Sequence, residues 1–257
     1  MMRAWGRARV RRHVSVPFSP RAVADLQGWW EAVDLAELAS GETVATWRDL
    51  SGHNRDATQD LTGKRPTFQT DQVTGLPSVR FDGLDDSLVG SSGLSAGSSV
   101  TMFVVANSQG SSPRGRVFSL GTSVPGRELG LGADTTGTRL AVLGFEAADA
   151  TVIDRETRAS NRGWHVASLV YVPGGLLELR RNGGDALTFT FPGVRAALNV
   201  DAGMSDPPFA LGAAAGGVQN PCRVALTVVL LYGRALDENE RAQIERWLGA
   251  GHGIDVI

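Results

Sequence analysis

Short runs of apolar and β-branched residues, separated by glycine, proline and polar residues, recur along the chain. The run 100–106 is almost continuously apolar, which is typical of a buried central strand. The run 77–81 alternates between polar and apolar residues and stops at the turn dipeptide Asp82-Gly83. Further runs with strand character occupy 26–31, 44–47, 116–121, 139–143, 164–171, 176–181, 186–191, 209–212 and 223–232. Because no helical pattern separates these runs, parallel βαβ folds are excluded, and the pattern predicts an all-β antiparallel sandwich.

Two local signals predict a tight turn and a short helix. Asn182-Gly183 is the strongest hairpin signal in the sequence, because both residues tolerate positive φ. Ser19-Pro20 predicts a short helical turn through Asp25, since proline is favoured at the first helical position. We therefore expect a hairpin around residue 182 and a helical entry into the domain.

Only the end of the chain has a clear α-helical pattern. Asp237 can cap a helix, and Glu240, three residues later, completes a capping-box pattern. One face of this helix would carry Ile244, Trp247 and Leu248. Gly249 and Gly251 are expected to end the helix. The pattern predicts a C-terminal α-helix packed against the sandwich.

Length and composition indicate one domain. The chain has 257 residues, of which 32 are glycine, and aromatic residues make up 7%. An all-β sandwich of this length is commonly a single unit, and abundant glycine suits many strands joined by tight turns. We therefore predict one domain over 18–257, preceded by an arm over 1–17.

The predicted arm is basic and contains no acidic residue. Its arginines are Arg3, Arg7, Arg9, Arg11 and Arg12. Such a segment is either a solvated tail or an arm that docks onto a partner. An acidic partner surface would suit its arginines. Docking to a partner is our hypothesis for these five arginines.

Charge, cysteine content and hydropathy exclude several classes of protein. The net charge of −2 argues against nucleic-acid binding driven by a basic field. Cys222 is the only cysteine, so an internal disulfide and a cysteine-rich zinc site are excluded. The longest apolar run, 224–232, is about half the roughly 20 residues needed to cross a bilayer, and no apolar stretch follows the N-terminal arginines. We expect a soluble protein with no membrane insertion and no export signal of its own.

Three carboxylates, Asp82, Asp85 and Asp86, fall within five residues around a glycine. Carboxylate oxygens in such a cluster can bind a hard cation such as Ca²⁺, and Asp49 and Asn54 could complete the site. A turn stabilised by aspartate side-chain hydrogen bonds accounts for the same residues. The sequence therefore offers a candidate Ca²⁺ site and a purely structural alternative.

Motifs for catalysis are weak. The segment 93–97 (GLSAG) matches G-x-S-x-G, but a Gly/Ser loop precedes it and a strand follows, whereas a nucleophile elbow needs a strand and then a helix. Glycoside hydrolysis needs two carboxylates across one sugar, and Glu128, Glu146 and Glu178 are single acids in separate segments. We therefore predict no catalytic residues and a protein that is not an enzyme.

The histidines are candidate metal ligands, and the tryptophans are candidate stacking surfaces for sugars. The histidines are His13, His53, His165 and His252, and their spacing does not suit a metal site. Strand alternation requires one of Trp29 and Trp30 to face outward, where a flat indole could stack on a pyranose. The inward member of that pair is expected in the core, as are Trp47, Trp164 and Trp247, and the sugar-binding residues remain unassigned.

Several strings together resemble the concanavalin A-like lectin/glucanase superfamily in its laminin-G-like branch. They are 26–32 (LQGWWEA), 46–54 (TWRDLSGHN), 75–83 (GLPSVRFDG), 163–167 (GWHVA) and 231–240 (LYGRALDENE). The resemblance covers nearly the whole of 18–254 and implies a jelly-roll sandwich. It is weak for activity, because this fold hosts lectins, enzymes and structural modules.

A short arginine-rich head leading into such a module is also similar to tail and surface proteins of bacteriophages. This resemblance implies a non-catalytic virion protein of structural or adhesive function, in contact with other virion or tail proteins and with host surface polysaccharide. It also implies a homo-oligomer or a place in a larger assembly, on the virion surface or tail. The alternatives are a cellular or secreted carbohydrate-binding module and, less favoured, a glycoside hydrolase.

Overall fold

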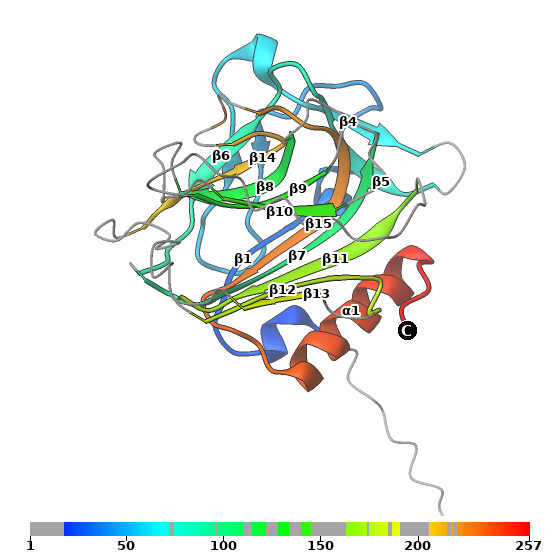
Figure 1. The fold of residues 1–257 in the computed structure, drawn as a ribbon. Helices are drawn as coiled ribbons and strands as arrows, with labels where there is room; N and C mark the ends of the chain where they lie inside the picture. Colours follow the sequence, from blue (N-terminus) through cyan, green and yellow to red (C-terminus); the bar gives the residue numbers. More distant parts are fainter. Residues whose placement is uncertain are drawn as a thin grey trace, which may run out of the picture.

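Two antiparallel β-sheets pack face to face in the computed structural model of this protein (Figure 1). The structure describes residues 18–71, 75–95, 97–109, 115–121, 128–133, 140–144, 163–173, 175–184, 187–190, 206–214, 217 and 220–257. A single α-helix, α1 (Glu238–His252), follows the last strand of this described part. The predicted all-β, two-sheet antiparallel sandwich with a C-terminal helix is confirmed.

The first sheet carries the helix on its outer face. Its strand order is β13 (Leu187–Thr190), β12 (Leu176–Arg181), β11 (His165–Tyr171), β7 (Val100–Ser108), β15 (Arg223–Tyr232), β5 (Pro77–Asp82) and β4 (Thr67–Thr70). A further strand, β1 (Leu26–Glu31), pairs with the second half of β15. The predicted central strand over 100–106 therefore lies between two neighbours, as its continuous apolar sequence requires.

The second sheet closes the other side of the core. Its strand order is β10 (Leu140–Gly144), β9 (Glu128–Ala133), β8 (Gly115–Gly121), β14 (Pro208–Leu211), β6 (Leu88–Ser91), β3 (Ala57–Thr58) and β2 (Thr46–Trp47). Three short 3₁₀ turns accompany the strands within the described residues, η1 (Pro20–Ala22), η2 (Ala32–Leu35) and η3 (Thr62–Lys64). The strands β3, β4, β6 and β9 were missed by the sequence pattern.

Side chains from the inner faces of both sheets form one apolar core. Trp30 and Trp47 are fully buried in it, and the Trp30 ring lies 4.6 Å from that of Phe209, centroid to centroid. The alternating run of β5 places Val79 and Phe81 in this core. Successive side chains of a strand point to opposite faces, so Ser78 and Arg80 must lie on the outer face of the first sheet.

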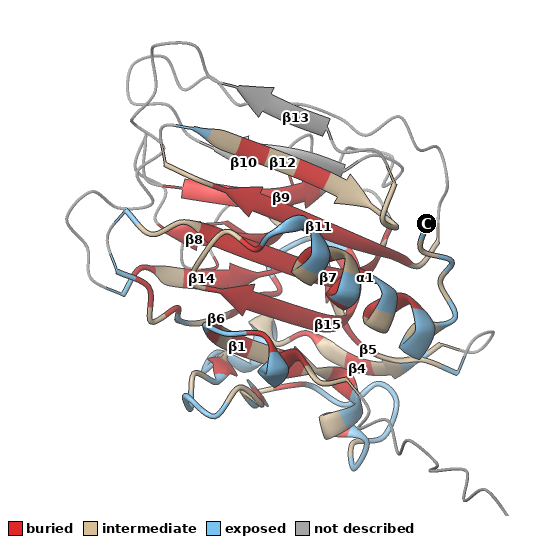
Figure 2. Cartoon of the chain, turned by 90° about the horizontal axis from the view of Figure 1, so that it is seen from below, coloured by how far each residue is buried: buried red, intermediate tan, exposed pale blue. Residues whose placement is uncertain are grey.

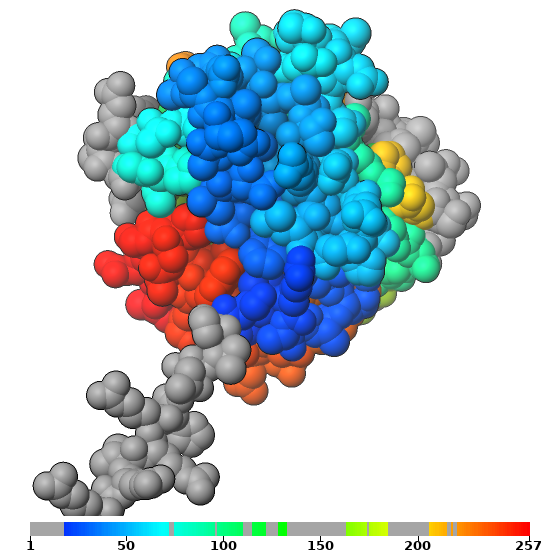
Figure 3. Space-filling model, turned by 180° about the vertical axis from the view of Figure 1, so that it is seen from behind, coloured from blue at the N-terminus to red at the C-terminus, as the bar shows by residue number. Residues whose placement is uncertain are grey.

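The helix α1 lies against that outer face (Figures 1 and 2), and a second apolar cluster lies beneath it. It joins Phe103 and Val105 of β7 and the outward residues of β15 to Ile244 and Leu248 of the helix. Phe18 and Trp29 contact Trp247 edge to face, with ring centroids 6.1 Å apart in each pair. Figure 3 shows the same proximity from behind, with the N-terminal part of the domain in blue against the red helix.

Buried charges also fix the helix to the sheet. Arg241 donates from Nε to the Ser168 hydroxyl at 2.8 Å and forms an ion pair with Glu178 of β12. Glu245 lies 3.3 Å from the same Nε and accepts a hydrogen bond from the Ser168 hydroxyl. We call Ser168, Glu178, Arg241 and Glu245 the helix-docking cluster. Since Arg241 and Glu245 are almost fully buried, their charges depend on these partners.

The predicted helix and hairpin signals are largely confirmed. Asp237 accepts from the Glu240 amide at 2.9 Å, and the Glu240 carboxylate accepts from the Asp237 amide at 3.2 Å, which completes the capping box. Asn182 and Gly183 have φ of 51° and 69° and join β12 to β13. Ser19 caps η1, but this turn ends at residue 22 rather than at Asp25, which itself has a φ of 69°.

The predicted helix stop is wrong by a few residues. The helix continues past Gly249 to His252, and Gly253 ends it with a left-handed φ of 65°. A Cβ on Gly249 would lie 2.5 Å from a methyl of Val256. That glycine therefore permits the C-terminal segment to pack back on the helix. Within the described residues, no helix is long and apolar enough to cross a membrane.

Candidate functional site

The outer face of the first sheet is divided into an apolar half and a polar half. The apolar half lies under α1 and includes Val228 and Leu230 of β15. At the other end of β15, Val224 and Leu226 point into the core, so Arg223 and Ala225 point outward. A shift in the β7–β15 register between Leu226 and Val228 lets both halves of β15 keep core residues inward.

The strand register assembles polar side chains from four strands on this polar half. Ala225 is the cross-strand partner of both Arg80 on β5 and Asn107 on β7. Arg80 is in turn opposite Thr67 of β4, and Ser78 is opposite Gln69. Thr67, Arg80, Ala225 and Asn107 thus form one row across β4, β5, β15 and β7, in which Ala225 has the smallest side chain.

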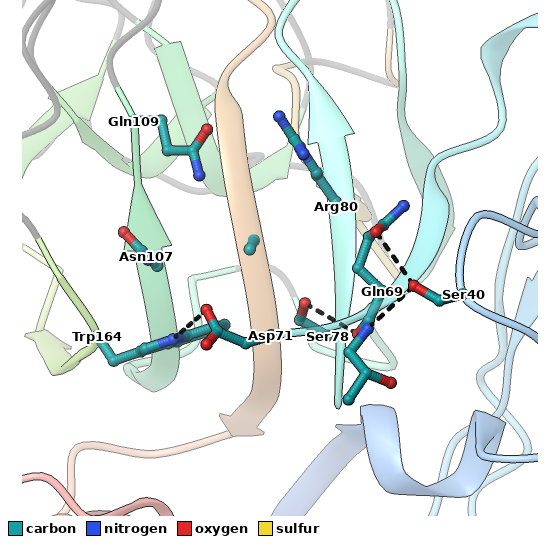
Figure 4. A pocket seen from close by; sticks show the side chains of 10 residues that line it. Ser40, Gln69, Asp71, Ser78, Arg80, Asn107, Gln109 and Trp164 are labelled. Carbon is teal, nitrogen blue, oxygen red and sulfur yellow. Dashed lines mark hydrogen bonds between the residues drawn. The ribbon is translucent and has the colours of Figure 1, made fainter. Parts of the chain in front are cut away.

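A groove of about 250 Å³ lies over this row (Figure 4). Its lining is Ser40, Gln69, Thr70, Asp71, Ser78, Arg80, Asn107, Gln109, Trp164 and Ala225. We call it the amide groove, because carboxamides enter it from both sides, Gln69 from one and Asn107 and Gln109 from the other. Carboxamides offer both donors and acceptors, so the lining can bond several hydroxyl groups of one ligand.

Hydrogen bonds fix part of this lining in place. The Gln69 carboxamide oxygen lies 3.3 Å from the Ser40 hydroxyl, and that hydroxyl accepts from the Thr70 amide at 3.4 Å. Half-buried Trp164 donates from its indole nitrogen to Asp71 at 3.4 Å. The Trp164 side chain therefore forms one wall of the groove while its ring packs against the cluster beneath α1.

A second depression, of about 350 Å³, adjoins the amide groove. Its lining is Arg65, Thr67, Gln69, Arg80, Asp82, Asp86 and Arg223. Because Gln69 and Arg80 line both hollows, we treat them as one continuous groove and call this part the arginine end. Arg65 is held by backbone carbonyls at 2.8 Å and 3.0 Å, from Gln59 and Asp60.

The predicted carboxylate cluster lies at the arginine end. Asp82, Asp85 and Asp86 each place one oxygen within 4.8 Å of the others, so the structure brings the three together. Asp82 accepts from the Leu84 amide at 2.8 Å, and Asp86 accepts from the Asp82 amide at 2.9 Å. Gly83 has a φ of 79°, and a Cβ there would lie 2.8 Å from the Arg223 backbone nitrogen. Only glycine therefore permits the turn to lie against β15.

The electrostatics of this turn raise the pKa of Asp86. Burial raises the pKa of Asp86 to about 6, and the charges of Asp82 and Asp85 act in the same direction, against the hydrogen bond from the Asp82 amide. A divalent cation would relieve this repulsion, whereas Arg80 and Arg223 line the same hollow and oppose it. The Ca²⁺ site therefore stays a prediction, whereas the hydrogen bonds show that Asp82 and Asp86 stabilise the turn, as the alternative interpretation predicts.

Asp49 and Asn54, which were expected to complete the Ca²⁺ site, belong to a different turn. The Asp49 carboxylate accepts from the Trp29, Ser51 and Arg55 amides at 3.0, 2.8 and 3.1 Å, and from the Ser51 hydroxyl at 2.7 Å. Burial alone would raise the pKa of Asp49, but these bonds outweigh it and lower the pKa. Both of its oxygens are therefore engaged in the turn, and Asp49 is not part of the Asp82–Asp86 cluster, so the prediction for Asp49 is wrong and that for Asn54 stays a prediction.

For the other residues considered for binding or catalysis, the structure shows packing, a loop position or ion pairs within the fold. Trp29 is the member of the Trp29–Trp30 pair that faces outward, and α1 covers it. Its ring therefore offers no free stacking surface at that position. Ser95 lies in the loop between β6 and β7, with no helix behind it in the described residues. Glu178 belongs to the helix-docking cluster, and buried Glu128 pairs with buried Arg116 at 2.8 Å.

Several predicted residues lie outside the described part of the chain. They are Arg3, Arg7, Arg9, Arg11, Arg12, His13 and Glu146. The predicted docking of the arm therefore stays a prediction. Of the remaining histidines, His165 is buried in the sandwich, and His252 bonds the Leu248 carbonyl at 2.7 Å.

The sequence pattern missed the groove itself. Alternation within 77–81 already marked Ser78 and Arg80 as outward, which was a usable signal. No pattern in the sequence placed Asn107 and Gln69 on either side of them, because that depends on strand order and register.

Comparisons with known proteins identify the fold and no family. No protein-family model matches the chain, and no curated protein is similar to it in sequence. Trypanosoma rangeli sialidase in complex with sialic acid superposes with a TM-score of 0.57 at 16% identity, over 89% of this chain and 33% of the sialidase. The chain thus spans about a third of the sialidase's length.

Two toxin binding domains share the same fold. The binding domain of Paraclostridial Mosquitocidal Protein 1 gives a TM-score of 0.57 at 14% identity, over 88% of this chain and 52% of that one. The binding domain of Botulinum Neurotoxin DC, in complex with SialylT, gives 0.58 at 10% identity, over 90% and 52%. At these identities the similarity establishes the fold alone.

Proposed function

We propose that this protein is a non-catalytic glycan-binding module of the concanavalin A-like, laminin-G-like type, and that the groove on the first sheet is its binding surface. The main observation behind the proposal is the row of outward polar residues that the strand register places on either side of Ala225. Carboxamides, hydroxyls and an indole wall are the groups that bond sugar hydroxyls and pack on sugar C–H faces. The neurotoxin binding domain of the same fold, whose structure contains SialylT, adds support by analogy, as does the sialidase, a third of which matches this fold and whose structure contains sialic acid.

The groove suits a saccharide better than an apolar ligand. Its lining contains one aromatic ring and one alanine among eight polar or charged residues. A sugar presents hydroxyls to such a lining, whereas an apolar ligand would leave its buried donors and acceptors unpaired. The groove is open along the sheet, so a unit within a longer chain can also lie in it.

The strongest argument for an enzyme is the Asp82–Asp86 pair. Two adjacent carboxylates, one with a raised pKa, are a common acid–base arrangement in hydrolases. Both aspartates, however, lie four residues apart in one turn and accept its backbone amides, so they do not stand on opposite sides of a sugar. We therefore propose binding without turnover, and a reducing-sugar assay that detected products would contradict this.

The direct test is binding of the purified protein to bacterial cell-wall polysaccharides, with and without a Ca²⁺ chelator. Saturable binding that Asn107→Ala and Gln69→Ala weaken would support the groove as the surface. Loss of binding on chelation would make the Asp82–Asp86 turn a Ca²⁺ site that organises it. If no polysaccharide binds under either condition, the proposed function is wrong.

The proposed place of this module is the surface or tail of a virion, where the arginine-rich arm would dock it to other virion proteins. This part rests on the sequence resemblance to phage proteins alone. Deletion of residues 1–17 tests it, because a docked subunit should lose incorporation into particles while glycan binding by the domain persists. A cellular or secreted carbohydrate-binding module would bind glycan equally well with and without the arm.

A further inference from the structure

We propose that the arginine end of the groove binds the carboxylate of an acidic sugar unit, so that the ligand is an anionic glycan. This inference rests on the proposed function and names the class of glycan. It concerns Arg80 and Arg223, for which no role was predicted from the sequence.

The register places the two guanidinium groups within reach of one ligand. Arg80 is directly opposite Ala225, and Arg223 lies two residues earlier on β15, on the same face. Residues in this diagonal relation have Cα atoms about 7–8 Å apart, a separation that two arginine side chains can span. Both side chains line the same hollow.

Neither guanidinium is engaged by the protein. In the part of the chain that the structure describes, the guanidinium groups of Arg80 and Arg223 make no hydrogen bond or ion pair. Asp82 is the cross-strand partner of Arg223, yet its carboxylate accepts the amides of its own turn. Arg80 is half-buried, and a half-buried cation without a partner favours an anionic ligand.

The shape of the site favours a carboxylate. A guanidinium is planar and presents paired N–H donors that match the two oxygens of a carboxylate. Arg80 lines both parts of the groove, so an acid group bound there remains connected to a sugar ring among the carboxamides. The expected ligand is therefore a uronic or sialic acid unit whose ring lies in the amide groove.

The test uses the full chain on an array in which each acidic oligosaccharide is printed beside its methyl ester. The array includes hexuronic and sialic acids, and sulfated neutral sugars form a third set. We expect the free acids to bind at least about tenfold more tightly than their esters, as the loss of a charge-assisted bond requires. Arg80→Gln and Arg223→Gln should each reduce this ratio towards one, and Arg80→Lys should reduce it in part.

The matched control is Arg246→Gln, which removes an exposed arginine of α1 that lines neither hollow and should leave the ratio unchanged. Equal binding of acids and esters by the unmodified protein would overturn the carboxylate assignment and leave glycan binding standing. Equal binding of sulfated sugars would also overturn it, since the arginines would then recognise charge alone. Binding to none of the glycans would contradict the proposed function itself.

Discussion

Ala225 on β15 lies directly opposite Arg80 on β5 on the outer face of the first sheet. Its methyl group leaves room between Arg80 and Asn107, so a small residue forms the floor of the groove. The identity of residue 225 therefore decides whether a ligand can lie across the sheet.

Replacing Ala225 by leucine should fill the groove. We expect Ala225→Leu to weaken glycan binding at least about tenfold, because a side chain in the cavity excludes a sugar ring. The melting temperature should change by less than about 4 °C, since the added carbons enter an open hollow. Binding and melting are compared with Ala250→Leu, a change at an exposed helix position. Unchanged binding by Ala225→Leu would place the glycan elsewhere.

The helix-docking cluster should contribute more to stability than a surface ion pair of α1. Arg241→Met leaves buried Glu245 unpaired, and we expect unfolding in urea to show a loss of about 3–5 kcal/mol. Arg234→Met breaks a partly exposed pair with Glu240 and should cost about 0–1 kcal/mol. The double change Arg241→Met with Glu245→Met should recover part of the loss. Equal effects of the two single variants would mean that the cluster is dispensable for docking.

Local signals predicted the elements, and tertiary contacts decided the site. The capping box of Asp237 and Glu240 and the turn at Asn182 depend on neighbours in sequence, so the pattern was sufficient for them. Alternation required one of Trp29 and Trp30 to face outward, but no strand pattern showed that this is Trp29 or that α1 covers it. The strand β4 has only four residues and was missed, although its Gln69 forms a wall of the groove.

The groove could not be predicted because its parts are distant in sequence. Thr67, Arg80, Asn107 and Ala225 become neighbours only through the register of β4, β5, β7 and β15. The carboxylate cluster was predicted correctly as a cluster, since its members share one turn. Register is set by hydrophobic alternation over whole strands, and a shift of one residue would exchange Arg80 with a core residue.

His165 should make the fold sensitive to acid. Burial lowers the pKa of its imidazole to about 4, and the charge of Arg181 adds to this, against the bond to the Gly163 carbonyl. In the unfolded chain the pKa is near 6.5, so the unfolded state binds more protons between these values. Stability present at pH 7 is therefore lost as pH falls from about 6.5 towards 4, by at most roughly 3 kcal/mol.

Urea unfolding at a series of pH values measures this effect. His165→Gln cannot take up a proton and should flatten the pH dependence over that window, although it can lower stability at every pH. The control His53→Gln changes an exposed histidine and should keep the wild-type slope. If the slope persists in His165→Gln, other groups are responsible for the acid sensitivity.

The titration of Asp86 should change folding stability with pH in the opposite direction to that of His165, over a similar pH range. Burial and two neighbouring carboxylates raise its pKa to about 6, above the value of about 4 in an unfolded chain, so the folded state binds more protons between these values. Its contribution therefore becomes less favourable as pH rises from about 4 to 7, by roughly 1–2 kcal/mol once solvent screening of this half-buried group reduces the full effect. Asp86→Asn keeps an oxygen for the Asp82 amide and removes the charge, so with a chelator present it should be more stable than wild type at pH 7 and not at pH 4. Asp255→Asn, at an exposed position, serves as the control, and a destabilised Asp86→Asn at pH 7 would show that the charged form of Asp86 stabilises the turn.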